Sequence, residues 1–304
     1  FYPEPLPNGE TWSAHVRQYV FDTWQRVSGC YAFQPYDGPP LELLDLYTAK
    51  SGQEIVSQLY NFEDKGERGV SLRPEMTPTV ARMIAARERH YKKPIKWYSF
   101  PQVFRYERQQ KGRLREHFQF NADIFGEIDP AADAELIALL IDILRGFGLT
   151  ADDFVIRLSS RHAWQDFFSK HSDDISKAHC FYQAVDKIER TSPEDSDNKF
   201  KAFGITLDQV REFIDSGEPT AELKAVLDNL KVRGMEDFVK VDYNVIRGLA
   251  YYTGLVYEAF DRHGKYRAIA GGGRYDQLVK LVSGGKIDMP AAGFAMGDVV
   301  LTEL

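Results

Sequence analysis

The chain has 304 residues, a mass of 34.8 kDa and a formal net charge of −7, with 43% hydrophobic and 27% charged residues. This composition is that of a globular protein with material for about two domains, and it excludes fibrous and disordered classes. No apolar run reaches the ~20 residues of a membrane helix, the first residues lack the pattern of a secretory signal, and two cysteines without CxxC spacing favour a reducing compartment. We therefore expect a cytoplasmic protein with no membrane partner, no disulfide framework and no zinc ribbon.

The first ninety residues predict helices around a region of short strands. Apolar residues recur at helical spacing over Trp12–Val27, and a second helix is expected over Tyr47–Ser57. Between them, Tyr31–Leu46 is rich in proline and aromatic residues and predicts a short strand and a turn. Two short strands around a KGERG turn follow, and then a helix over Thr77–Arg89.

The middle of the chain changes character near residue 163. Ile95–Gly126 has the pattern strand, strand, long loop, strand; Ala131–Phe147 predicts an amphipathic helix, and Asp152–Leu158 a strand. Residues 163–237 are instead charged, helical in periodicity and poor in strand signals. This contrast predicts a helical insertion subdomain at 163–237, inside a core formed by residues 1–162 and 238–304.

Strand signals return after residue 238. FVKVDYNVIRG predicts a strand, and YTGLVYEAF with YRAIA predicts a hairpin around a DRHGK turn. Gly271–Gly273 predict a turn into a helix, and the final AAGFAMGDVVLTEL predicts a strand or loop that enters a helix. Because strands outnumber βαβ alternations and helices come in blocks, we expect an α+β fold with an antiparallel sheet flanked by helices.

Positive charge is concentrated in one segment of this acidic protein. Between Arg82 and Arg115 there are eleven lysines and arginines and two glutamates. A local basic stretch suits phosphates or another polyanion, although charge alone fits a solvated basic face equally well.

The basic segment runs into a strand with two different faces. His117, Gln119, Asn121 and Asp123 alternate with the apolar residues of HFQFNADIF, so one face of the strand carries imidazole, amide and carboxylate groups. An antiparallel sheet commonly has one solvated face, but such faces usually carry Thr, Lys and Glu. The pattern favours a binding face, with His117 itself more typical of a hydrogen-bonded structural histidine.

Several segments together resemble the class II aminoacyl-tRNA synthetases, and most closely the histidyl-tRNA synthetases. VFRYERQQKGRLREHFQFNADIFG is similar to the family's motif 2, a strand with FRxER, a basic loop and a returning strand. The other similar segments, in chain order, are the initial FYP, PPLE (Pro39–Glu42), LRPEMTP (Leu72–Pro78), RGLAYYTG (Arg247–Gly254), GGGRYDQLV (Gly271–Val279) and AAGFAMGD (Ala291–Asp298). They cover the chain from end to end in the family's order, which implies the class II synthetase fold.

The resemblance implies a role for each matching residue. It implies catalysis by Arg105 and Arg247, and ATP binding by Arg105, Glu107 and Arg113. It implies histidine binding by Glu75, Thr77, Arg105, Gln119, Asp123, Arg247, Tyr251, Tyr252 and Tyr275. Of the adjacent tyrosines, only one is expected to face the pocket, since neighbouring side chains diverge.

These residue types suit the implied reaction. Attack of a carboxylate on the α-phosphate brings two anions together, and arginine forks placed in advance stabilise the charge that develops. Recognition of an imidazole requires buried acceptors and donors, because a hydrogen-bonding site rejects ligands that leave its groups unpaired.

The resemblance also implies substrates and partners. ATP, L-histidine and tRNA(His) are the expected substrates, Mg²⁺ is expected to arrive on the ATP phosphates with no protein metal site, and the proline-containing PPLE segment implies a homodimer. The family continues into an anticodon-binding domain, which is expected to be absent from this chain.

One departure from the family concerns adenine. Most class II enzymes carry an arginine in motif 3 that stacks on adenine, and GDVV places Val300 there, as in a subgroup of histidyl-type sequences. The alternative function is a non-catalytic, synthetase-like regulatory subunit of ATP phosphoribosyltransferase. Such paralogues tend to lose the arginines of motif 2 and RGL, and Arg105, Arg113 and Arg247 are all present, which favours the enzyme.

Overall fold

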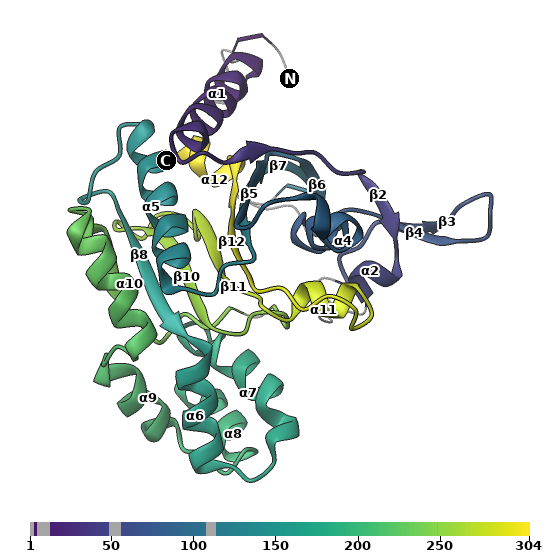
Figure 1. Cartoon of the computed structure of the whole chain (residues 1–304). Helices are drawn as coiled ribbons and strands as arrows, with labels where there is room; N and C mark the ends of the chain where they lie inside the picture. The colour runs from purple at the N-terminus through teal and green to yellow at the C-terminus, as the bar shows by residue number, and fades with distance from the viewer. Residues whose placement is uncertain (1–2, 5–12, 49–55, 108–113, 248) are drawn as a thin grey trace.

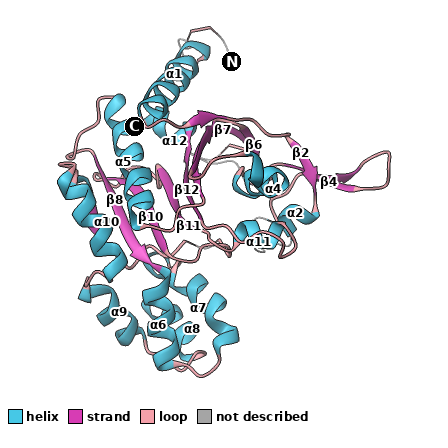
Figure 2. Cartoon of the chain, viewed as in Figure 1, coloured by secondary structure: helices cyan, strands magenta, loops and turns pink. Residues whose placement is uncertain are grey.

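A computed structural model describes residues 3–4, 13–48, 56–107, 114–247 and 249–304. A large sheet occupies the middle of the molecule, with α5 and α10 along one side of it (Figure 1). The helices α6 to α9 gather at one end, and the β3–β4 hairpin extends from the other (Figures 1 and 2).

The large sheet contains nine strands within the described residues. Its order is β1-β5-β7-β12-β11-β10-β8-β9, and β6 pairs with the start of β7. Pairing is antiparallel except at the two edges, where β1 pairs β5 and β9 pairs β8 in parallel. The strands are β1 (Gln34–Pro35), β5 (Ile95–Ser99), β6 (Gln102–Phe104), β7 (Glu116–Phe125), β8 (Phe154–Ser160), β9 (Val239–Val241), β10 (Leu255–Asp261), β11 (Ala270–Arg274) and β12 (Ala291–Gly297).

A second, three-stranded antiparallel sheet has the order β2 (Leu41–Leu43), β4 (Gly69–Leu72), β3 (Asn61–Glu63). An ordinary surface strand buries its apolar side chains and exposes its polar ones, and strand β2 of this sheet does the reverse. In β2 the carboxylate of Glu42 is buried and receives the guanidinium of Arg82 at 2.6 Å, whereas Leu41 and Leu43 are exposed. The sheet therefore turns an apolar face outward.

Helices surround both sheets, and several begin at side-chain caps. Asp129 accepts from the backbone N–H of Ala131 at the start of α5, and Thr206 and Gln209 form a capping box at the start of α9. The helices are α1 (Ala14–Cys30), α2 (Asp45–Thr48), α4 (Thr77–Arg87), α5 (Pro130–Gly146), α6 (Arg161–His171), α7 (Ala178–Val185), α8 (Pro193–Lys201), α9 (Leu207–Ser216), α10 (Ala221–Val232), α11 (Leu278–Val282) and α12 (Asp298–Glu303). Over the described residues, none of them has the length and apolar character to cross a membrane.

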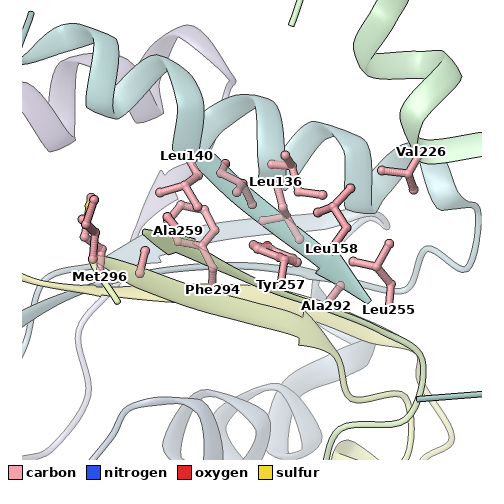
Figure 3. Close-up of a cluster of buried hydrophobic side chains, with 14 of the residues drawn as sticks. Leu136, Leu140, Leu158, Val226, Leu255, Tyr257, Ala259, Ala292, Phe294 and Met296 are labelled. Atoms are coloured by element: carbon pink, nitrogen blue, oxygen red, sulfur yellow. The ribbon is translucent and has the colours of Figure 1, made fainter. Parts of the chain in front are cut away.

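The two faces of the large sheet differ in side-chain size. Large residues of β8, β10 and β12, such as Leu158, Tyr257 and Phe294, point toward α5 and pack with Leu136 and Leu140 (Figure 3). On β12 the residues between the large ones are glycine or alanine, from Ala291 to Gly297. Apolar burial against α5 thus fixes the sheet, while the opposite face is left shallow.

The expected α+β class is confirmed, and most predicted elements are present. Residues 95–126 contain β5, β6 and β7, and the region from 161 to 232 is helical. The predicted helix over Tyr47–Ser57 overlaps α2 only at its start, and residues 49–55 lie outside the described residues.

The predicted hairpin after β10 was wrong in its second strand. Only the last residue of YRAIA is in a strand, and the glycine triplet predicted as a turn lies in β11, between β10 and β12. A Cβ on Gly272 would lie 2.5 Å from the Gly293 carbonyl oxygen and 2.7 Å from Tyr257 Cζ. Glycine here serves the close approach of strands, not a turn.

Candidate active site

Two adjoining cavities lie on the sheet face opposite α5. The first, which we call the inner pocket, has a volume of about 40 Å³. It is lined by Glu75, Thr77, Arg105, Gln119, Arg247, Leu249, Tyr251, Tyr252, Tyr275, Gly293, Phe294 and Ala295. Segments far apart in the sequence therefore meet here: the start of α4, the end of β6, β7, the loop before β10, and the end of β11.

Glu75 presents a buried acceptor to the inner pocket. Its side chain is 5% exposed, and its Oε2 accepts a hydrogen bond of 2.7 Å from the Tyr251 hydroxyl. The other oxygen, Oε1, has no hydrogen-bond partner among the described residues, and neither does Oε1 of Gln119. Buried acceptors without partners are costly, so both are suited to a ligand that carries N–H groups.

Asp123 lies behind the pocket wall formed by Tyr275. Its carboxylate accepts a hydrogen bond from the Tyr275 hydroxyl, and its other oxygen has no partner among the described residues. Burial raises the pKa of Asp123 to about 7, although the bond from Tyr275 opposes the shift. Gly293 permits this contact, because a Cβ there would lie 2.4 Å from Asp123 Oδ1 and 2.5 Å from the Tyr275 hydroxyl.

Arg247 is held in an unusual conformation. Its backbone φ is +58°, a left-handed value rare outside glycine, and its Nη1 donates to Glu258 Oε1 at 2.5 Å. The guanidinium lies directly over Gly271, where a Cβ would approach Nη1 to 2.1 Å. Burial by itself would lower the pKa of Arg247, but Tyr252 and Glu258 outweigh it and raise the pKa, so the side chain stays charged.

The second cavity, the outer pocket, has a volume of about 580 Å³. It shares Arg105, Gln119, Arg247 and Ala295 with the inner pocket. Its other lining residues are Glu107, Leu114, His117, Glu189, Arg190, Glu258, Phe260, Tyr266, Arg267, Ala268, Ile269, Ala270, Gly271, Gly297, Val299 and Val300. Burial lowers the pKa of His117 to about 3, and nearby Arg105 adds to the shift, so this imidazole is neutral at physiological pH.

The structure brings most of the sequence-predicted site residues to these two pockets. Glu75, Thr77, Arg105, Gln119, Arg247 and the three tyrosines line the inner pocket, and Glu107 lines the outer one. Arg113 lies outside the described residues. The expectation that only one of Tyr251 and Tyr252 faces the pocket was wrong, because the two lie in irregular backbone before β10, where side chains need not diverge as they do in a strand.

Sequence reasoning missed several lining residues. Glu258 is the most direct omission, since it binds Arg247 from the neighbouring strand β10. The sequence feature that could have identified Glu258 is a carboxylate on the strand that immediately follows RGLAYYTG. His117, expected to be a hydrogen-bonded structural residue, instead lines the outer pocket.

Comparison with known proteins places this arrangement in one family. Residues 31–297 match the family model described as "Histidyl-tRNA synthetase". The histidine–tRNA ligase of Opitutus terrae is 46% identical over 99% of this chain and 72% of that protein, and that of Thermoplasma volcanium is 40% identical over 100% and 72%.

A solved structure from Bacillus halodurans shares the fold. It is described as an ATP phosphoribosyltransferase regulatory subunit/histidyl-tRNA synthetase, and it superposes with a TM-score of 0.81 at 19% identity, over 100% of this chain and 82% of that one. At that identity the likeness concerns the fold alone. The family model and the curated relatives carry the assignment: the chain belongs to the histidyl-tRNA synthetase family.

Proposed function

We propose that the two pockets activate L-histidine with ATP. A histidine carboxylate oxygen attacks the α-phosphorus, the bond from that phosphorus to the bridging oxygen breaks, and histidyl-adenylate and pyrophosphate result. The histidyl group then passes to tRNA(His). The observation that carries this proposal is the meeting of a small pocket with buried acceptors and a wider pocket with cations at two shared arginines, Arg105 and Arg247.

The shared arginines would act on the reacting groups. Because Arg105 and Arg247 line both pockets, each guanidinium can reach an anion from either side. Arg105 Nε donates to the Pro74 carbonyl oxygen at 2.9 Å, and Arg247 is held by Glu258, so both forks are oriented before substrate arrives. Donors placed in advance stabilise the charge that develops in phosphoryl transfer without reorganising.

The inner pocket would select the amino acid. Glu75, Thr77 and Gln119 would hold the ammonium and imidazole nitrogens, with Tyr251, Tyr252 and Tyr275 as walls. Asp123 would act from behind Tyr275, by setting the orientation of its hydroxyl. At about 40 Å³ the pocket must widen to admit an amino acid.

Magnesium would be carried by the nucleotide. No group of three or more His, Cys, Asp or Glu side chains that could hold a metal ion occurs in the described part of the chain. Mg²⁺ prefers phosphate and carboxylate oxygens and commonly binds through a substrate's phosphates, and Glu107 in the outer pocket offers a carboxylate to such an ion. When bound, the ion would neutralise charge on the outer phosphates, where Arg113 is also expected.

The enzyme is favoured over the regulatory subunit. The relatives at 46% and 40% identity are named as histidine–tRNA ligases, and Arg105 and Arg247 are both present at the junction of the pockets. Supporting features of a cytoplasmic enzyme are the two free cysteines, Cys30 and Cys180. Within it, residues 163–237 would form the helical insertion and 1–162 with 238–304 the catalytic core.

The decisive experiment is ATP–pyrophosphate exchange with each of the twenty amino acids. Exchange that depends on histidine alone is expected, and Arg247→Ala should lower it by on the order of 10²-fold, as for loss of a charged donor. Exchange with another amino acid, or a folded Arg247→Ala protein of normal rate, would overturn the proposal.

A homodimer is proposed from the three-stranded sheet. Leu43 on β2 and Phe62 on β3 both lie opposite Val70 of β4, and they are 54% and 52% exposed. A row of apolar side chains facing outward, with a carboxylate buried beneath it, is typical of an interface. Leu43→Glu should shift the sedimentation equilibrium toward monomer, while Lys65→Glu, at the exposed hairpin turn, should not.

A further inference from the structure

The outer pocket adjoins the inner pocket at one end, which leaves its other end for the nucleobase of ATP. Arg105 and Arg247 mark the end next to the inner pocket, where carboxylate and α-phosphate must meet. The ribose and base of ATP would therefore extend away from these arginines, toward the wall made by the residues before β11 and by the start of α12. That wall includes Val300, an apolar side chain that gives the base no cation.

The pairing of β11 with β12 brings another residue to this wall. Ala270 lies opposite Met296 and Gly271 opposite Ala295, in antiparallel register. β12 ends at Gly297 and α12 begins at Asp298, so the residues just before β11, Arg267 among them, approach the start of α12. Arg267 and Val300 both line the outer pocket, one from the strand side and the other from the helix.

Two hydrogen bonds, one from a side chain and one from the backbone, anchor the residues on either side of Arg267. The hydroxyl of Tyr266 donates to the Glu303 carbonyl oxygen of α12 at 2.7 Å, and the Ile269 N–H donates to the Ala259 carbonyl oxygen at 2.8 Å. The segment is thus tied both to the helix that carries Val300 and to β10. An arginine on a tethered backbone loses less freedom on binding than one on a loose loop.

We propose that Arg267 binds the adenine of ATP, supplying from the β10–β11 connection the guanidinium that the Val300 position does not supply. This inference rests on the proposed function. A guanidinium is planar, always charged and weakly hydrated, so it stacks on a purine face. Arg190 also lines the outer pocket and comes from the short helical turn Ile188–Arg190, which no described hydrogen bond ties to α12.

The test measures binding of ATP and adenosine by calorimetry to the wild type, Arg267→Ala and Lys265→Ala. Adenosine has no phosphate, so it reports contact with the base and ribose alone. Arg267→Ala should weaken both ligands by roughly 5- to 30-fold, the range of a partly desolvated cation–π contact. Lys265→Ala, an exposed cation outside the pocket, should bind as the wild type does.

Relocating the cation provides a second test. Arg267→Ala combined with Val300→Arg should recover most of the lost adenosine affinity, because the new arginine reaches the same space from the helix. Unchanged adenosine binding in Arg267→Ala would overturn the proposal. So would weaker binding of ATP with normal binding of adenosine, which would place Arg267 on the phosphates. The binding assay tests Arg267 alone. Loss of histidine-dependent exchange would instead contradict the proposed function, and it would not change the binding results.

Discussion

The inner and outer pockets differ in both their volume and the side chains that line them. The inner pocket is small, walled by tyrosines and built on carboxylates that already accept hydrogen bonds from Tyr251 and Tyr275. The outer pocket is more than ten times larger and is lined by charged side chains on several elements. Under the proposed function, discrimination among amino acids would come from fixed buried geometry, while the nucleotide would be held largely by charge. Substitutions at residues that line only one pocket can therefore test each pocket separately.

The largest expected difference between the pockets is their response to pH. Burial raises the pKa of Asp123 from 3.8 to about 7 and lowers that of His117 from 6.5 to about 3. Between pH 4 and 7 the unfolded chain has lost the Asp123 proton that the folded protein keeps, so this group's contribution to stability falls as pH rises. Between pH 3 and 6.5 the unfolded chain binds a His117 proton that the folded protein lacks, so that contribution rises with pH.

Each shift corresponds to about 5 kcal/mol at most. Urea unfolding across pH 4 to 8 should therefore show opposite slopes. The stability of the wild type relative to Asp123→Asn should fall with pH, and relative to His117→Gln it should rise. Parallel slopes would show that the two groups do not titrate as their burial indicates.

A smaller effect is expected from Gly271→Ala, which acts at the junction of the pockets. The added methyl group would occupy the position of the Arg247 guanidinium and displace it from Glu258. We expect exchange to fall by on the order of 10²-fold, as it would on losing the arginine itself. Gly29→Ala is the matched control, because an added methyl group there meets no atom within 4 Å and the backbone is not left-handed. Gly148→Ala is unsuitable, because the φ of Gly148 is +91° and alanine would be strained there. Near-normal exchange in Gly271→Ala would show that Arg247 works from another position.

The smallest effect separates the pockets most cleanly. Asp123→Asn keeps the shape of the side chain, but an amide can turn either its oxygen or its NH₂ group toward Tyr275, and the charge is lost. A hydrogen bond to a charged group contributes roughly 1.5–3 kcal/mol, so the KM for histidine should rise about tenfold or more. The KM for ATP should stay near its wild-type value. If both constants rise together, Asp123 supports β7 and not recognition.

Local periodicity predicted the frame of this molecule because its strands alternate clearly. On β7, Phe120, Ala122 and Ile124 point into the core and Gln119 lines the site, as the alternation of HFQFNADIF indicates. The same reasoning failed for the glycines of β11, because three glycines show no alternation of apolar and polar side chains and are typical of turns. Glycine is required here by contacts with other elements: Gly271 leaves space for the Arg247 guanidinium, and Gly272 for the backbone of β12.

The pairing of distant residues could not be obtained from patterns. Motif similarity named Arg247 but not Glu258, because the contact depends on a left-handed backbone at Arg247 and on the register of β10 beside β11. Asp123 was placed with Gln119 on one strand face, yet Tyr275, which directly follows β11, lies between it and the pocket. Which side chain covers another is decided by packing between elements.

Under the proposed function, the side chains common to both pockets would couple the two substrates. Arg105 and Arg247 would each face a histidine carboxylate on one side and a phosphate on the other, so the first anion to bind reduces the positive potential that the second one meets. Coupling of this kind is a property of the pair and is equal in both directions. Measuring the affinity for histidine with and without a saturating, unreactive ATP analogue therefore also fixes how histidine changes the affinity for that analogue.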